Sequence, residues 1–138
     1  ADGRTDGDLA VLEAVDASLV TVTEQVERVE LRAALRTGMD AAAAVNVYLN
    51  ATEPWRLAKA DADRARVVLG TALAAVAGVR VALSPWLPFS TAALDDVLGT
   101  VDSWERVEPT PGASVPQPAP LFAKVDLEEL LDDLASGE

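Results

Sequence analysis

Apolar residues recur every three or four positions along most of the chain, and this spacing limits the fold more than any other feature. The first stripe follows Asp8, which we expect to cap a helix. The stripe consists of Leu9, Leu12, Val15, Leu19, Val22 and Val26. A second helix is expected to start around Val29. Its predicted buried face consists of Leu31, Leu35, Met39, Ala42, Val45 and Leu49.

Pro54 interrupts the pattern, because proline lacks an amide donor and disfavours helix in the residue before it. A third helix, capped by Asp61 or Asp63, is predicted to run to Leu83 with enough apolar coverage to be central. Pro85 and Pro88 end it, and residues 91–98 predict one more short helix before Gly99.

Small residues are frequent in these stripes, and three glycines lie inside the predicted helices. Gly38, Gly70 and Gly78 each cost roughly 1 kcal/mol relative to alanine in a helix interior. Close contact with a neighbouring helix would offset that cost. We therefore predict an all-α fold, an antiparallel bundle of closely packed helices.

The chain divides into three parts by composition. Residues 1–7 are polar and glycine-rich, which is typical of a mobile lead-in, and residues 8–99 contain the helical pattern. Residues 100–138 contain nine acidic and two basic residues. Within this part, residues 101–107 predict a short extended piece, residues 109–120 a proline-rich linker, and residues 121–134 an amphipathic acidic segment. We expect that segment to pack back on the body of the protein or on another domain.

The chain contains no cysteine and no histidine. This excludes disulfides, thiol nucleophiles, the usual Cys/His zinc sites and histidine general bases. We therefore expect no catalytic residue, no metal site and no cofactor in this chain. No run of about 18 apolar residues and no secretory signal pattern occurs, so we expect a soluble, cytoplasmic protein without a membrane partner.

The net charge of −12 disfavours free-standing nucleic-acid binding, because phosphate neutralisation usually dominates such affinity. Any RNA contact would depend on local positive sites. Arg28, Arg32 and Arg36 form one such stripe at spacings of four. They have two interpretations: a solvated face paired with Glu24, Glu27 and Asp40, or a contact to an RNA backbone.

The sequence Asn46-Val47-Tyr48, followed by Pro54-Trp55 and Lys59, resembles the anticodon-binding domain of methionyl-tRNA synthetases. Two further segments match in the same order. Pro85-Trp86-Leu87-Pro88-Phe89 is similar to the link before the last short helix of this family. Residues 120–126 are similar to the Leu-Phe segment with which bacterial members return toward the catalytic domain, and we expect an actinobacterial member of the family.

The resemblance implies that Trp55, directed by Pro54, stacks on the first anticodon base of tRNA(Met). Base–aromatic stacking contributes about 1–3 kcal/mol per base. Arg56 and Lys59 are candidates for contacts to the tRNA backbone, as are the three arginines above. Asn46 and Tyr48 are expected to be structural, Asn46 through a backbone hydrogen bond and Tyr48 through a buried ring with a satisfied hydroxyl. For Trp86 and Trp104, which lack the motif, packing roles are expected.

The family has a second recognition element, an Asn and an Arg four apart on an earlier helix, which we expect upstream of Ala1. Residues 8–99 would then be the anticodon-binding domain without its first helix, and the chain alone would bind tRNA weakly or not at all. The ATP-site signatures of the family are missing, so ATP and Mg²⁺ would belong to a parent catalytic domain. Two alternatives remain: a free-standing helical protein-interaction module, and a degenerate synthetase relative that binds another RNA.

Overall fold

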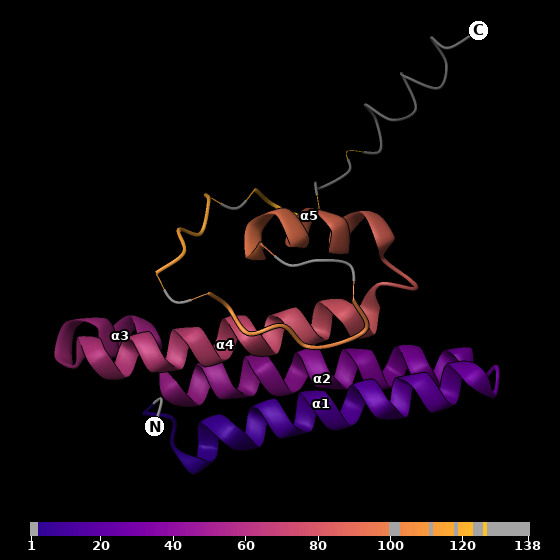
Figure 1. Cartoon of the computed structure of the whole chain (residues 1–138), viewed down its shortest axis with the longest axis horizontal. Coiled ribbons are helices and arrows are strands. Elements are labelled where there is room, and N and C mark those ends of the chain that lie inside the picture. Colours follow the sequence, from indigo (N-terminus) through magenta and orange to yellow (C-terminus); the bar gives the residue numbers. More distant parts are fainter. Residues whose placement is uncertain (1–2, 100–102, 111, 118, 123–125, 127–138) are drawn as a thin grey trace, which may run out of the picture.

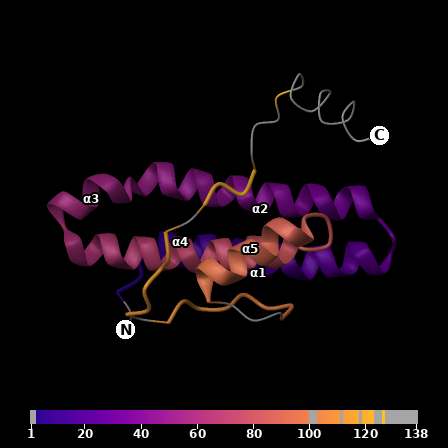
Figure 2. The ribbon, with the colours of Figure 1, turned by 90° about the horizontal axis from the view of Figure 1, so that it is seen from above.

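The computed structural model describes residues 3–99, 103–110, 112–117, 119–122 and 126, and all regular structure within these residues is helical. The helices are α1 (Asp6–Glu27), α2 (Leu31–Thr52), α3 (Pro54–Ala60), α4 (Ala62–Leu83) and α5 (Pro88–Leu98). The long helices α1, α2 and α4 pack against one another, with α2 antiparallel to the other two (Figures 1 and 2). The short helices α3 and α5 contact α4. The predicted all-α antiparallel bundle is confirmed.

Helix α1 begins two residues before the predicted cap. Thr5 is the N-cap, and Asp8 occupies the third helical position of a capping box. The backbone N–H of Thr5 donates to Asp8 Oδ2 at 2.7 Å. The prediction that Asp8 caps the helix was therefore wrong, because the Thr-x-x-Asp pattern places the threonine at the cap.

The turn between α1 and α2 contains an unusual backbone conformation. Val29 has φ of 59°, a left-handed conformation that is rare for a β-branched residue. Helix α2 consequently starts at Leu31, two residues after the predicted start.

The buried face of α2 differs from the predicted one. The structure buries Ala34, Gly38, Ala41, Val45 and Tyr48. Leu31 and Met39, predicted as core residues, are 52% and 53% exposed. Val45 is buried as predicted, and Leu35, Ala42 and Leu49 are half-buried, so the core side of α2 is shifted part of a turn from the predicted face.

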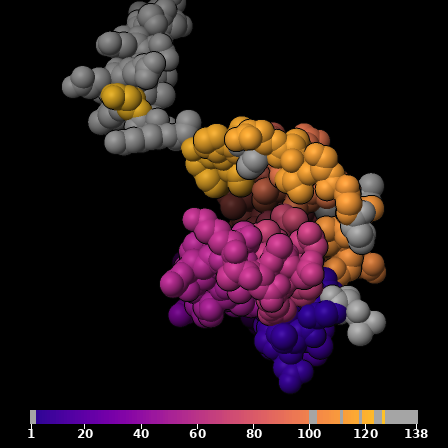
Figure 3. Space-filling model, turned by 90° about the vertical axis from the view of Figure 1, so that its left-hand side faces the viewer, coloured from indigo at the N-terminus to yellow at the C-terminus, as the bar shows by residue number. Residues whose placement is uncertain are grey.

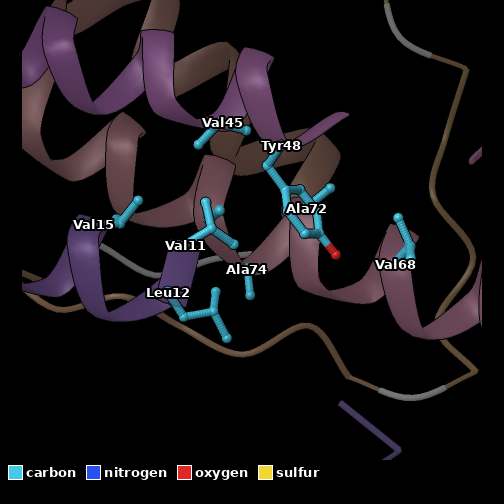
Figure 4. Close-up of a cluster of buried hydrophobic side chains, with 9 residues drawn as sticks. Val11, Leu12, Val15, Val45, Tyr48, Val68, Ala72 and Ala74 are labelled. Atoms are coloured by element: carbon cyan, nitrogen blue, oxygen red, sulfur yellow. The ribbon is translucent and has the colours of Figure 1, made fainter. Parts of the chain in front are cut away.

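Helix α4 lies at the centre, as predicted. Asp61 is its N-cap and accepts a hydrogen bond from the backbone N–H of Arg64 at 2.9 Å. By length and hydropathy α4 could cross a membrane, but 61% of its most apolar window is buried within the fold, which is the property of a core helix. The core around α4 consists of one cluster from α1, α2 and α4 (Figure 4) and a second near the α1–α2 turn.

Two of the three glycines that were predicted to lie inside helices make close contacts with a neighbouring helix. A Cβ at Gly38 would lie 2.8 Å from Leu83 Cδ2, and a Cβ at Gly78 would overlap Val15 Cγ1. A Cβ at Gly70 would meet no atom within 4 Å, so the predicted close contact is not found there.

Helix α5 extends three residues further toward the N-terminus than predicted, because Pro88 occupies its first position. Gly99, at φ of 64°, ends it as expected. Arg80 of α4, only 5% exposed in its side chain, pairs with Asp95 of α5 and connects the two helices.

Residues 103–110 lie along α1 and α4 without forming a helix or strand. Arg106 donates to both carboxylate oxygens of Asp16 at 2.8 and 3.0 Å, and Arg4 donates to Glu108 at 2.7 Å. Thus the segment is held by ion pairs rather than by strand pairing. Of the predicted extended piece, residues 101–102 lie outside the described residues, as does most of the amphipathic segment 121–134.

Candidate nucleic-acid interface

Trp55 lies at one end of the bundle, on the short helix α3 that joins α2 to α4 (Figure 1). Its side chain is 56% exposed, whereas the preceding Pro54 is buried. This end of the molecule is formed by the end of α2, by α3 and by the start of α4, with the start of α1 beside them (Figure 3). Most of a large aromatic surface is therefore available to solvent while its base is anchored.

The connection before Trp55 fixes the direction of α3. Glu53 adopts a left-handed conformation with φ of 42° and is at once the C-cap of α2 and the N-cap of α3. Its N–H donates to the carbonyl of Leu49 at 2.9 Å, and its own carbonyl accepts from Arg56 N–H at 2.8 Å. Pro54 follows at the first helical position, which suits its fixed φ.

Two basic side chains share α3 with Trp55. The side chain of Arg56 is 74% exposed and pairs with Glu53 Oε2 at 3.0 Å. Lys59 is exposed in the last turn of α3. Both side chains can reach a phosphate near the indole. Arg56 would have to leave its ion pair with Glu53 to do so, and this costs little because an exposed ion pair contributes only about 0–1 kcal/mol.

A buried polar cluster at the same end of the bundle joins α1, α2 and α4. Asp8 is fully buried and accepts a hydrogen bond from the Tyr48 hydroxyl at 2.5 Å. Arg64 donates to both oxygens of Asp8, at 2.5 and 2.8 Å. Tyr48 is thus buried with its hydroxyl bonded, as expected for this motif residue.

The pKa values of the buried cluster follow from these contacts. Burial alone would raise the pKa of Asp8, but hydrogen bonds from Arg64, Tyr48 and Thr5 outweigh it and hold the pKa well below the ordinary value. Burial and the hydrogen bond to Asp8 raise the pKa of Tyr48. The cluster is therefore an ionised carboxylate neutralised by one arginine, and it fixes the end of α2 from which Trp55 extends.

Asn46, the other motif residue, is exposed on α2. The hydrogen bonds found between described residues do not include its predicted bond to a neighbouring backbone.

The three arginines of the predicted stripe lie at the opposite end of the molecule. All three are exposed, on the α1–α2 turn and the first half of α2. Arg36 lies sixteen residues before the end of α2 at Thr52, which is about 24 Å along the helix, and Trp55 follows that end on α3. The structure therefore does not place this stripe beside Trp55.

The arginine stripe makes few ion pairs. Arg28 approaches Glu24 at 4.0 Å, and the predicted pairs with Glu27 and Asp40 are not among those formed by the described residues. Arg32 and Arg36 border a shallow depression of about 600 Å³. It is also lined by Val29, Glu30, Leu31 and Ala33.

The other two tryptophans have different environments. Trp86 packs against the buried cluster near the α1–α2 turn. Trp104 is 42% exposed, and its indole N–H donates to Thr23 Oγ1 on α1 at 2.6 Å. Trp55 thus differs from both in being largely exposed on a short, anchored helix.

The sequence did not reveal the buried cluster or the ion pairs of residues 103–110. A signal for the cluster was present, since Thr5 and Asp8 have capping-box spacing and that spacing fixes where the carboxylate lies. Nothing in the sequence pairs Arg106 with Asp16, ninety positions away.

Comparisons with known proteins agree with this geometry. A family model described as the anticodon binding domain of methionyl tRNA ligase matches residues 2–134. The methionine–tRNA ligase of Roseiflexus sp. (strain RS-1) is 34% identical over 161 residues, covering 94% of this chain and 27% of that protein. The ligase of Thermobifida fusca (strain YX) is 31% identical over 170 residues, covering 97% of this chain and 28% of that protein.

A solved structure shows the same fold. The apo form of Mycobacterium tuberculosis methionyl-tRNA synthetase matches with a TM-score of 0.78 and 26% identity, covering 89% of this chain and 27% of that one. The chain therefore spans little more than a quarter of the length of the relatives it matches. With its helical bundle and its Pro-Trp motif at the bundle end, the chain belongs to the family of methionyl-tRNA ligase anticodon-binding domains.

Proposed function

We propose that this chain reads the anticodon of tRNA(Met) as part of a methionine–tRNA ligase, with Trp55 as a stacking surface for the first anticodon base. The observation that carries the proposal is the environment of Trp55: an indole 56% exposed on a helix fixed by a buried proline. An unpaired base in a loop can place its face on such a ring without any sequence-specific hydrogen bond.

Anticodon reading and methionine attachment are thereby assigned to different domains. In the parent ligase, ATP-dependent attachment of methionine takes place in a catalytic domain, which is also the protein partner of this chain. We assign ATP and Mg²⁺ to that domain, because this chain matches only about a quarter of methionine–tRNA ligases and carries none of the ATP-site signatures. A cytoplasmic location follows from the same assignment, since that is where tRNA is charged.

Replacement of the indole tests the stacking role. In a fluorescence titration at low salt with a labelled CAU anticodon stem-loop, Trp55→Ala should weaken binding about 5- to 150-fold, equivalent to the 1–3 kcal/mol of one stacked base. Trp55→Phe, which keeps an aromatic face, should retain most of the affinity. Trp104→Phe is the matched control, because Trp104 is also partly exposed but lies on another surface.

Equal affinities for the parent chain and Trp55→Ala would refute the stacking role. A stem-loop with another anticodon distinguishes the alternative of a relative that binds a different RNA. If that stem-loop binds as tightly as the CAU stem-loop, methionine-specific reading is wrong even if stacking is right.

A further inference from the structure

The short helix α3, which presents Trp55, buries little of its own surface. Of its seven residues, only Pro54 is buried, and Leu57 is half-buried against the core cluster of Figure 4. A helix of this length is not stable by itself, because its few hydrogen bonds do not offset the cost of nucleation. The orientation of α3, and with it that of the indole, therefore depends on how the two ends of the helix are held.

The N-terminal end of α3 is connected to the backbone of α2 beside Tyr48. Thr52, the last residue of α2, donates from its hydroxyl to the carbonyl oxygen of Tyr48 at 2.8 Å. Glu53 follows directly, and its N–H donates to the carbonyl oxygen of Leu49, the residue after Tyr48. The position of Tyr48 therefore determines where α3 begins.

The C-terminal end of α3 is connected to Arg64. Asp61 is at once the C-cap of α3 and the N-cap of α4. Its carboxylate accepts a hydrogen bond from the backbone N–H of Arg64 at 2.9 Å. Because a single residue separates the two helices, a rotation of α3 also moves the first turn of α4. The position of Arg64 therefore determines where α3 ends.

One buried carboxylate holds both of these residues. Asp8 Oδ1 accepts from the Tyr48 hydroxyl at 2.5 Å and from Arg64 Nη2 at 2.8 Å. Asp8 Oδ2 accepts from Arg64 Nη1 at 2.5 Å, and the whole side chain of Asp8 is buried. Hydrogen bonds to an ionised group are about twice as strong as those between neutral groups. The two residues that determine the ends of α3 thus converge on the same carboxylate.

We propose that Asp8 is a positioning residue for Trp55. By holding Tyr48 and Arg64 it fixes both ends of α3, and thereby the direction in which the indole projects. This role rests on the proposed function, because a preoriented ring loses less side-chain freedom when a base stacks on it. The fixed direction of the indole can nevertheless be measured without RNA.

The heteronuclear nuclear Overhauser effect (NOE) of the three indole N–H groups measures their mobility in the isotope-labelled chain without RNA. Tyr48→Phe removes one hydrogen bond to Asp8 and keeps the ring in the core. Arg64→Lys keeps the charge and loses the two-fold contact to the carboxylate. In both variants the Trp55 signal should lose part of its NOE, while the signals of the other two tryptophans stay unchanged.

Val22→Ala is the matched control for a general loss of stability. It removes buried methyl groups in the second core cluster, near the α1–α2 turn, and should lower the free energy of unfolding by a similar amount. Val22 is fourteen residues from Asp8 on the same helix, which is about 21 Å. The Trp55 NOE should therefore keep its original value in this variant. Circular dichroism confirms that each variant retains its helical content.

When the CAU stem-loop is added, Tyr48→Phe should weaken binding about 2- to 10-fold, the cost of ordering one mobile side chain on binding. Val22→Ala should bind like the unaltered chain. An unchanged Trp55 NOE in both variants of the cluster, or an equal loss in Val22→Ala, would overturn the positioning role.

Comparison with Trp55→Ala separates this role from base stacking itself. If Trp55→Ala weakens binding but Tyr48→Phe does not, the fixed direction of the indole has no part in binding, and the positioning role is overturned. If neither variant weakens binding although Tyr48→Phe lowers the Trp55 NOE, base stacking is refuted and the positioning of the indole by Asp8 is upheld.

Discussion

At the scale of single residues, the contact between Tyr48 and Asp8 explains why a tyrosine occupies this motif position. The hydroxyl reaches across from α2 to a fully buried carboxylate at the start of α1, while Arg64 holds the same carboxylate from α4. The Asp8 carboxylate on α1 thus connects the end of α2, through Tyr48, to α4, through Arg64.

Tyr48→Phe should destabilise the fold by about 1.5–3 kcal/mol, because it removes a hydrogen bond to a buried charge. Urea unfolding measures this change. Asn46→Ala is the control on the same helix and should change the free energy of unfolding by less than about 0.5 kcal/mol, since Asn46 is exposed. Similar effects for both variants would mean that the hydroxyl contact does not stabilise the fold.

The lowered pKa of Asp8 makes stability depend on pH in the acid range. In the unfolded chain Asp8 takes up a proton near its ordinary pKa of about 3.9. In the folded protein Asp8 stays ionised to lower pH, because its pKa is lowered. The stabilisation is therefore fully present above about pH 4 to 5 and is lost as pH falls toward the folded-state pKa. Asp8→Asn should flatten the pH dependence of the free energy of unfolding below about pH 5. An unchanged slope would show that other carboxylates dominate.

At the scale of helices, two glycines of α4 differ in how closely a neighbouring helix packs against them. A methyl group at Gly78 would overlap Val15, whereas a methyl group at Gly70 meets open space. Gly70→Ala should therefore stabilise the fold by about 0.5–1 kcal/mol through helix propensity alone. Gly78→Ala should destabilise it by about 1–3 kcal/mol through overpacking.

Thermal unfolding of the two glycine variants provides the comparison, with each protein serving as the control for the other. If Gly78→Ala were as stable as Gly70→Ala, the close approach of α1 and α4 in the structure would be wrong.

Periodicity predicted the long helices because each stripe extends over many turns and proline separates them clearly. It placed the buried face of α2 only in part, because apolar residues occupy two adjacent stripes of this helix: Val45 is buried as predicted, whereas Leu31 and Met39 are exposed. Helix α3 was not predicted, since its seven residues are too short to show a period. The separation of Trp55 from Arg36 was implied by the predicted helix, because α2 runs between the two residues.

At the scale of the whole molecule, charge and distance predict a small electrostatic contribution to RNA binding. Only Arg56 and Lys59 share α3 with Trp55, and Arg28, Arg32 and Arg36 lie about 24 Å or more from the end of α2 that precedes it. If two phosphates are contacted, log Kobs should fall against log salt with a slope of about −1.4, and with five contacts the slope would be about −3.5.

These two cases are distinguished by measuring anticodon stem-loop binding at salt concentrations from about 20 to about 200 mM. A slope near the steeper value would mean that the α1–α2 turn also contacts RNA. In that case Arg32→Glu should reduce the slope, while Arg56→Glu should reduce it in either case.

Stacking of an RNA base on Trp55 is tested most directly by the three indole N–H resonances of the chain. Trp55, Trp86 and Trp104 each give one such signal, in surroundings that the structure distinguishes: exposed on α3, packed against the core, and bonded to Thr23. NMR titration detects even weak binding. When the CAU stem-loop is added, we predict that the Trp55 indole resonance shifts progressively while that of Trp86 stays in place. A Trp55 resonance that does not move at saturating RNA, or three resonances that move equally, would contradict stacking on Trp55.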